Sequence, residues 1–215
     1  MIHSNFEVLQ LGLQDYQDTF EAMKHFTQNR NASTKDQLWV VEHPAVFTLG
    51  LAGDPKHILQ ETTIPLIQTD RGGQITYHGP GQVIVYVLLD LKRLGFYVKE
   101  LVRRIEQSII ATLAELDVQT ERHPGSPGIY LTKEYAQFAG AKIAALGLKI
   151  KNHYSYHGLA LNVKMDLSPF QAINPCGYPG LQTIDLASLG VTQRDSEVAN
   201  VLIQQLLGQL SITEE

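Results

Sequence analysis

The chain has 215 residues, a formal net charge of −5 and a hydrophobic share of 44%, against 18% charged residues. This size and composition predict one compact α/β domain, or at most two small ones, and exclude a disordered chain. The acidic balance and the lack of a dense Lys/Arg run disfavour nucleic-acid binding.

The first half of the chain predicts strands with one early helix. Apolar residues at three- and four-residue steps, among them Phe20 and Met23, predict a helix over 14–29. The stretch VIVYVLLDL is nearly all apolar, which is typical of a strand buried on both faces. The expected strands are 6–12, 37–43 ended by Pro44, 64–69, 74–78 and 83–91.

The second half carries two further helices and several short strands. Leu101, Ile105, Ile109 and Leu113 recur every four residues and predict a helix over 97–116. Further β-like segments are expected at 118–122, 128–133, 137–151 and 154–164. The last helix is expected over about 196–209, with Asp195 or Ser196 as its N-cap.

The strands cluster along the chain and do not alternate strictly with helices. This order favours an α+β fold, in which helices flank a mixed or antiparallel sheet. We find no repeat or linker-like stretch, so residues 1–215 are expected to form a single domain.

Compartment and membrane signals are consistent with one another. The single cysteine, Cys176, cannot close a disulfide within its own chain and fits a reducing compartment. The N-terminal stretch MIHSNFEVLQLGLQDY lacks the features of a signal peptide, and no apolar run approaches the ~20 residues of a membrane helix. We therefore expect a cytoplasmic protein without membrane segments.

Three dense stretches hold candidate site residues. The first, DRGGQITYHGPGQ at 70–82, has glycines that let a ligand approach main-chain N–H groups, and Arg71 and His78 to orient a polar ligand head. A glycine-rich hairpin with satisfied side chains explains the stretch equally well. No nucleotide-binding fingerprint fits it.

The second stretch is GAKIAALGLKI at 140–150, followed by SYHGLALNV. Lys142 lies among small and apolar residues. Burial would lower its pKa and make it a usable base, but a solvated lysine on a polar strand face is the commoner case. His157 has the same ambiguity between a core histidine and a ligand.

The third stretch, INPCGYPG at 173–180, places Cys176 on a Pro/Gly turn. Structural cysteines usually lie in apolar strands or helices, whereas a turn can present the thiol to a cleft with free N–H groups nearby. An inert loop thiol is the alternative.

Other kinds of site fit the sequence poorly. A metal site is disfavoured, because there is no H-E-x-x-H motif and only one cysteine, and the G-x-S-x-G elbow of serine hydrolases is absent. No cofactor is expected.

Across residues 36 to 190 the chain resembles the octanoyltransferase family of lipoate biosynthesis. The motifs RGGQITYHGPGQ, GAKIAALG, HGLALNV and NPCGY are present in order, with no departure at a motif position. The resemblance implies the fold shared by lipoate and biotin protein ligases. It also implies that Cys176 is the nucleophile and Lys142 the residue that activates it. The residues that it implies for the acyl site are Arg71, Gly72, Gly73, Gln74, Ile75, Thr76, Tyr77, His78, Ala145, Leu146, Gly147, Gly158, Leu159 and Ala160.

The family activity implies two protein partners and no ATP. The donor is octanoyl-acyl carrier protein, whose thioester is already activated. The acceptors are lysines on apo lipoyl domains of 2-oxoacid dehydrogenase complexes and on the glycine cleavage H protein. Cys176 would form an acyl-enzyme thioester, and Lys142 would activate it as a base or as an ammonium counter-charge.

Three other interpretations stay open on sequence alone. An ATP-dependent lipoate or biotin ligase would not need Cys176. A non-catalytic module would bind an acylated carrier. A Cys–His hydrolase would use His78 or His157 as its base.

Basic residues are expected to aid docking, because acidic carrier proteins and an acidic enzyme repel each other unless positive charge gathers near the site. The candidates are Lys92, Arg93, Lys99, Arg103 and Arg104 around the long helix, and Lys149, Lys151 and Lys164 beside the Lys142 segment. The second group is expected on the rim of the cleft.

Overall fold

The computed structural model describes residues 6–211, which fold into ten strands and four α-helices. The strands are β1 (Phe6–Leu13), β2 (Asp36–Glu42), β3 (Val46–Leu49), β4 (Leu66–Gln68), β5 (Ile75–His78), β6 (Gln82–Leu88), β7 (Thr120–His123), β8 (Ser126–Leu131), β9 (Lys142–Lys151) and β10 (Tyr154–Asn162). The helices are α1 (Tyr16–Asn29), α2 (Leu91–Leu94), α3 (Val98–Glu115) and α4 (Asp195–Ser211).

The strands form two sheets. The larger has seven strands in the order β1-β2-β6-β10-β9-β8-β7, and the smaller has three in the order β4-β3-β5. In each sheet one pair of strands is parallel, β1 with β2 and β3 with β4, and the other pairs are antiparallel. These mixed sheets with flanking helices confirm the predicted fold class.

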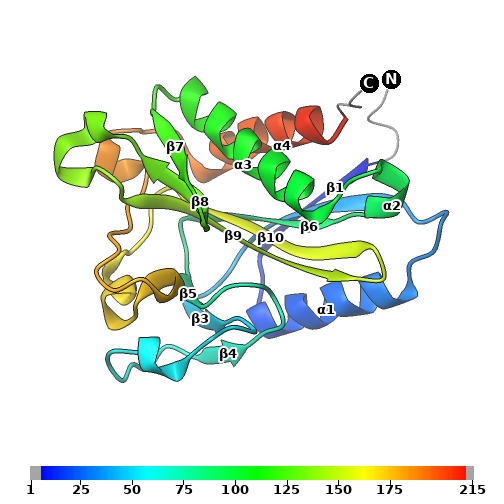
Figure 1. The fold of residues 1–215 in the computed structure, drawn as a ribbon, viewed down its shortest axis with the longest axis horizontal. Coiled ribbons are helices and arrows are strands. Elements are labelled where there is room, and N and C mark those ends of the chain that lie inside the picture. The colour runs from blue at the N-terminus through cyan, green and yellow to red at the C-terminus, as the bar shows by residue number, and fades with distance from the viewer. Residues whose placement is uncertain (1–5, 212–215) are drawn as a thin grey trace.

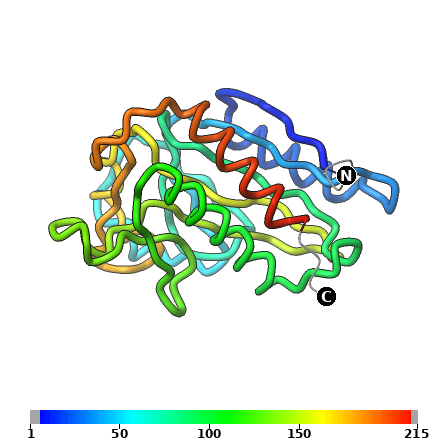
Figure 2. Tube along the Cα trace, turned by 90° about the horizontal axis from the view of Figure 1, so that it is seen from above, coloured from blue at the N-terminus to red at the C-terminus, as the bar shows by residue number. Residues whose placement is uncertain are grey.

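Helices cover both faces of the large sheet. Figure 1 shows α3 and α4 on one face and α1 on the other, and Figure 2 shows α3 and α4 side by side. The four-residue repeat of Leu101, Ile105, Ile109 and Leu113 explains why α3 buries one stripe completely against the sheet. On the opposite face, Phe20 and other apolar residues of α1 pack on β2 and β6. As a result, all seven residues of β6 are buried, as its apolar sequence predicts.

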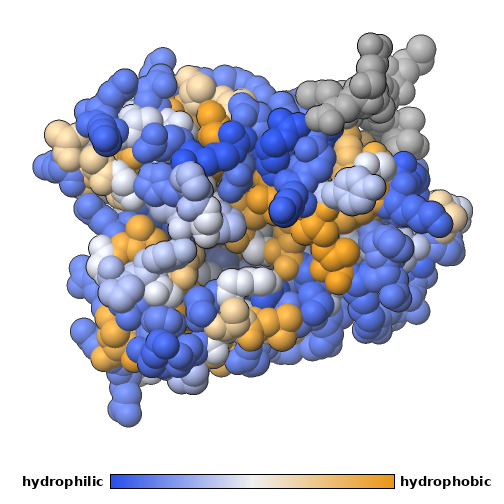
Figure 3. Space-filling model, in the orientation of Figure 1, coloured by the Kyte–Doolittle hydropathy of each residue, from blue (hydrophilic) through white to orange (hydrophobic). Residues whose placement is uncertain are grey.

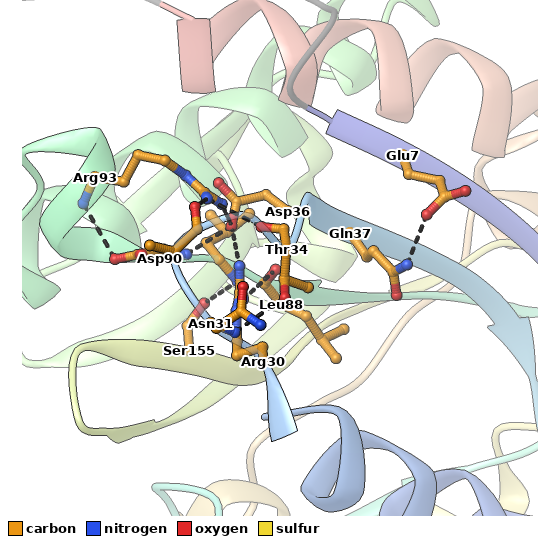
Figure 4. A network of polar contacts seen from close by, with 12 residues as sticks. Glu7, Arg30, Asn31, Thr34, Asp36, Gln37, Leu88, Asp90, Arg93 and Ser155 are labelled. Atoms are coloured by element: carbon orange, nitrogen blue, oxygen red, sulfur yellow. Dashed lines mark hydrogen bonds and ion pairs between the residues drawn. The ribbon is translucent and has the colours of Figure 1, made fainter. Parts of the chain in front are cut away.

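A buried polar network fixes one end of the large sheet (Figure 4). Asp36, at the start of β2, accepts hydrogen bonds from Arg30 at 2.5 Å and from the Asp90 N–H at 2.7 Å, and Arg93 lies 2.7 Å away. Arg30 also donates to the Leu88 carbonyl at 3.0 Å, at the end of β6. Loss of one partner would leave a buried charge, which typically costs about 3–5 kcal/mol.

Several predicted boundaries differ from the structure. The strand β3 was not expected, because its four residues begin only two positions after Pro44 and are too few to show a period. The strand expected over 83–91 ends at Leu88, since Asp90 caps the short helix α2 through its side chain. The strand expected over 137–151 begins only at Lys142, because residues 133–138 form 3₁₀ turns.

The last helix begins at Asp195, so the N-cap predicted at Asp195 or Ser196 is too late by at least one residue. Within residues 6–211 the structure contains no helix that is both long and apolar enough to cross a membrane.

Candidate active site

A cavity of about 440 Å³ opens between the large sheet and the glycine-rich stretch that leads into the small sheet. The space-filling view shows the surface hollowed there, with apolar side chains gathered beside the hollow (Figure 3). This volume lies within the range of small-molecule sites. The lining residues are Tyr16, Arg71, Gly72, Gly73, Gln74, Ile75, Thr76, His78, Ile84, Tyr86, Val98, Val102, Gly125, Ser126, Pro127, Lys142, Ala145, Leu146, Gly147, Leu148, His157, Gly158, Leu159, Ala160, Cys176 and Tyr178.

Lys142 and Cys176 meet in this cavity although they are 34 residues apart in the chain. Lys142 Nζ lies 3.0 Å from Cys176 Sγ and donates a second hydrogen bond, of 2.9 Å, to the Pro127 carbonyl. The Lys142 residue is only 4% exposed, which contradicts a solvated lysine on a polar strand face. The two contacts hold the ammonium against the sulfur.

Gly128 makes room for the lysine side chain. A Cβ at this position would lie 2.3 Å from Lys142 Cε and 2.9 Å from Nζ, closer than real side chains approach. Its φ of +129° is also one that only glycine adopts readily. The turn that supplies the Pro127 carbonyl is held by buried Glu106, whose carboxylate accepts the Gly128 N–H at 3.1 Å. Lys142 therefore depends on its neighbours for its direction.

Cys176 lies on a short 3₁₀ turn, Pro175–Gly177, and is half-buried. Its φ of +56° is uncommon for a residue that is not glycine and persists only where the surroundings impose it. The turn is anchored at its start, because the Asn174 N–H donates to the His57 carbonyl at 2.8 Å, and it is closed by the hydrogen bond of 2.9 Å from the Gly177 N–H to the Asn174 carbonyl. This geometry presents the sulfur to the cavity.

The pKa of Lys142 is governed by two opposing effects. Burial lowers it, but attraction to Cys176 and to Tyr130 raises it by more, so the net pKa is above the ordinary value. The expectation that burial alone would lower the pKa of this lysine and make it a free base is therefore wrong for the protein without substrate. At neutral pH Lys142 is an ammonium ion paired with the sulfur.

Both terminal nitrogens of Arg71 hold the glycine-rich loop. Its Nη2 atom donates to the Thr48 carbonyl, to Thr48 Oγ1 and to the Gln74 carbonyl at 2.7–2.9 Å, and Nη1 donates to the Gly72 carbonyl at 2.9 Å. The loop in turn attaches to β9, because the Gly72 N–H donates to the Leu148 carbonyl at 2.9 Å. Arg71 thus shapes the wall of the cavity.

Neither candidate histidine contacts the sulfur. His78 Nδ1 lies 2.7 Å from Gln82 Oε1, and burial, followed by the nearby charge of His43, lowers the pKa of His78 to about 3. His157 Nε2 lies 2.9 Å from Asp70 Oδ1, and burial lowers its pKa although Asp70 opposes this. Both are neutral at pH 7, and these contacts disfavour the Cys–His hydrolase.

Of the residues implied for the acyl site, all but one line the cavity. The exception is Tyr77, whose ring packs on Phe47 and Phe170 in a separate cluster under the small sheet. Its two neighbours, Thr76 and His78, do line the cavity, because successive residues of a strand face opposite sides.

Sequence reasoning did not identify several lining residues. Tyr16 and Tyr86 come from α1 and β6, and Val98 and Val102 from the first turns of α3. They belong to ordinary amphipathic or apolar patterns, so no local signal distinguishes them from core residues.

The expected basic cluster does not form as one group. Lys149 and Lys151 lie at the hairpin between β9 and β10, whereas Lys164 follows the other end of β10. Tyr156, the partner of Lys149, is six strand residues from Asn162, or about 20 Å, and Lys164 lies two residues beyond that end of β10. None of the three lines the cavity. In residues 6–211 we find no group of three or more His, Cys, Asp or Glu arranged to hold a metal ion.

Comparison with known sequences identifies relatives over almost the whole chain. Residues 15–207 match the family model described as lipoyl protein ligase A/B catalytic domain. An octanoyltransferase of Polynucleobacter necessarius is 56% identical over 207 residues, covering 94% of this chain and 97% of that protein. One of Paraburkholderia phymatum is 58% identical over 203 residues, covering 93% and 80%.

Solved structures share the fold at low sequence identity. A lipoate-protein ligase A bound with ATP superposes with a TM-score of 0.78 at 16% identity, over 96% of this chain and 85% of that one. A putative lipoate protein ligase from T. acidophilum with bound lipoic acid gives 0.75, also at 16%, over 96% and 86%. A biotin protein ligase from Aquifex aeolicus gives 0.55 at 11%, over 96% and 70%.

Proposed function

We propose a mechanism from the premise that this chain belongs to the octanoyltransferases of the lipoyl protein ligase A/B catalytic domain family and transfers octanoyl groups in protein lipoylation. The donor is octanoyl-acyl carrier protein, and Cys176 carries the octanoyl group as a thioester. The acceptor is a lysine on an apo lipoyl domain of a 2-oxoacid dehydrogenase complex or on the glycine cleavage H protein. The whole chain acts as one catalytic domain, in the cytoplasm.

One observation carries the proposal: the buried contact of 3.0 Å between Lys142 Nζ and Cys176 Sγ. An ammonium ion at this distance stabilises a thiolate, which is the nucleophilic form of cysteine. The cavity beside the pair has room for an acyl chain along Ala145, Gly158 and Ala160. Among residues 6–211, Lys142 is the residue that hydrogen-bonds to the sulfur.

The first half-reaction forms the acyl-enzyme. The Cys176 thiolate attacks the thioester carbonyl, a new C–S bond forms, and the bond to the carrier's sulfur breaks. The departing thiolate takes a proton from the Lys142 ammonium and leaves as a thiol. Lys142 is then a neutral amine, and Cys176 is an uncharged thioester.

Loss of the charge on Cys176 changes the lysine. The attraction that raised the pKa of Lys142 is weakened, while burial, which lowers it, remains. The amine therefore stays neutral and is ready to accept a proton. In the second half-reaction the acceptor amine attacks the acyl carbon and its proton passes to Lys142. The Cys176 thiolate leaves, which restores the ion pair with no net change of protons.

Intact mass spectrometry after mixing with octanoyl-acyl carrier protein tests this proposal. We expect a mass increase of one octanoyl group, retained on a peptide that contains Cys176 and transferred when an apo lipoyl domain is added. Cys176→Ala should remain folded by circular dichroism and show neither adduct nor transfer. Near-normal transfer by this variant would contradict the covalent mechanism. Transfer only from free octanoate with ATP would indicate a ligase.

A further inference from the structure

One wall of the cavity is an open strand edge. The ladder between β8 and β9 ends at the pair Ile129 and Ala144, because the chain of β8 turns away at Gly128. Beyond it, the next attachment on this side of β9 is the hydrogen bond from the Gly72 N–H to the Leu148 carbonyl. Leu146 lies between these two points and lines the cavity.

The main-chain groups of Leu146 point into this gap. In an antiparallel ladder, alternate residues turn their N–H and C=O groups toward the same neighbour. The main-chain N–H of Val163 points toward β6, where it donates to the Gly81 carbonyl. Ala160 is three residues away, an odd number, so its main-chain groups point toward β9, and those of its partner Ala145 point back toward β10. The main-chain groups of Leu146, the next residue, therefore point away from β10, as does the Leu148 carbonyl that accepts the Gly72 N–H.

The Leu146 N–H and C=O therefore form the unpaired part of the edge. Among residues 6–211, neither β8 nor the glycine-rich loop supplies a hydrogen-bond partner to them. Unpaired strand edges bind extended chains by main-chain hydrogen bonds.

The position of this edge relates it to the reacting pair. Leu146 is four residues along β9 from Lys142, or about 13 Å. Val98 and Val102 at the start of α3 also line the cavity, and Val98 is 46% exposed. We place the entry of the donor beside these two residues, so that its arm passes Leu146 on the way to Cys176.

The chemistry of the edge selects its ligand. A saturated acyl tail lying here would bury a donor and an acceptor without partners, at a cost of about 1–3 kcal/mol for each group. An amide supplies one acceptor and one donor and satisfies both. The acyl tail is better accommodated on the α1 side, where His78 is already paired with Gln82.

Building on the proposed function, we propose that the main chain of Leu146 binds an amide of the donor's pantetheine arm as an added strand would. The arm is thin, extended and carries two amides close to the thioester. A folded acceptor domain presents its lysine through four methylenes without an amide in the side chain. The donor arm is therefore the occupant that fits this narrow edge.

Small thioester donors test the inference on the unmodified enzyme. S-octanoyl-N-acetylcysteamine keeps one amide, S-octanoyl pantetheine keeps both, an ester analogue loses the N–H, and an alkyl analogue loses both polar groups. We expect kcat/KM for acyl-enzyme formation, normalised to the uncatalysed reaction with a small thiolate, to be roughly tenfold higher for the better amide donor than for the alkyl donor. Equal normalised values for all four donors would overturn the proposal.

Two variants locate the effect. Leu146→Pro removes the N–H at an edge position, where proline is tolerated, and should lose much of the preference for an amide. Leu146→Ala keeps the main chain and should retain the preference; its loss in this variant would assign the effect to the side chain and overturn the proposal. If Leu146→Pro unfolds, the four donors still decide the question. An unchanged preference in folded Leu146→Pro, or an effect only on the acceptor step, would contradict donor binding there.

Failure of this inference differs from failure of the proposed function. If no octanoyl adduct forms on Cys176 with the carrier-bound donor, the proposed function is wrong. If the adduct forms but the amide has no effect, only the role of Leu146 is wrong.

Discussion

Replacement of Lys142 by alanine isolates its effect on the reactivity of Cys176. The lysine makes one hydrogen bond of 3.0 Å to the sulfur, and its charge is almost completely buried. Coulomb's law at this distance with an effective dielectric constant of about 20 gives roughly 5.5 kcal/mol. Desolvation of the ammonium offsets part of this attraction. A net value of about 1.5–3 kcal/mol, as for other hydrogen bonds to charged groups, corresponds to roughly 10- to 150-fold.

Alkylation of Cys176 by iodoacetamide measures this effect without any acyl substrate. We expect the rate near neutral pH to fall by that factor in Lys142→Ala, since the thiolate is the reacting form. The rate should recover at alkaline pH. Lys151→Ala, an exposed lysine on the same strand, is the matched control and should follow the wild-type curve. Superimposable pH profiles for wild type and folded Lys142→Ala would refute the ion-pair account.

Three other changes test the site. Gly128→Ala should slow alkylation of Cys176, because the added Cβ displaces Lys142. Gly125→Ala is the control, since a Cβ there meets nothing within 4 Å, and equal alkylation rates for the two variants would count against positioning of Lys142 by Gly128. Ala160→Leu should shift the preference among hexanoyl, octanoyl and decanoyl donors toward shorter chains, and an unchanged ranking would place the tail elsewhere. Replacement of Lys149 and Lys151 by Glu should raise KM for the carrier-bound donor and weaken the dependence of this KM on salt, while the reaction with a small octanoyl thioester stays unchanged. An equal effect on both donors would argue against a role of these lysines in docking.

The sequence by itself predicts the long amphipathic helix and the buried central strand, because the spacing of apolar residues along the chain determines both. The four-residue repeat that includes Leu101 and Ile105 predicts α3, because a helix places every fourth residue on one face. The apolar run of β6 predicts its burial on both faces. The motifs around Lys142 and Cys176 are sufficient to nominate these two residues as candidates, because a family resemblance attaches to residues wherever they lie in space.

The sequence alone did not predict the short strand β3 or the relative positions of the surface lysines. The four residues of β3 form a strand only because β4 and β5 pair with them. Lys149 and Lys164 bracket the same motifs in sequence, yet an extended strand carries them to opposite ends of the sheet.

The chemistry of the site was decided by tertiary structure. Sequence places Lys142 among apolar neighbours, from which a lowered pKa follows; only the fold brings Cys176 to 3.0 Å, and the charge of the sulfur reverses the direction of the shift. Likewise, no pattern in GAKIAALGLKI reveals that Leu146 has an open edge. That depends on where β8 leaves the sheet, because hydrogen bonds between strands and charges across a cavity join residues that are distant along the chain.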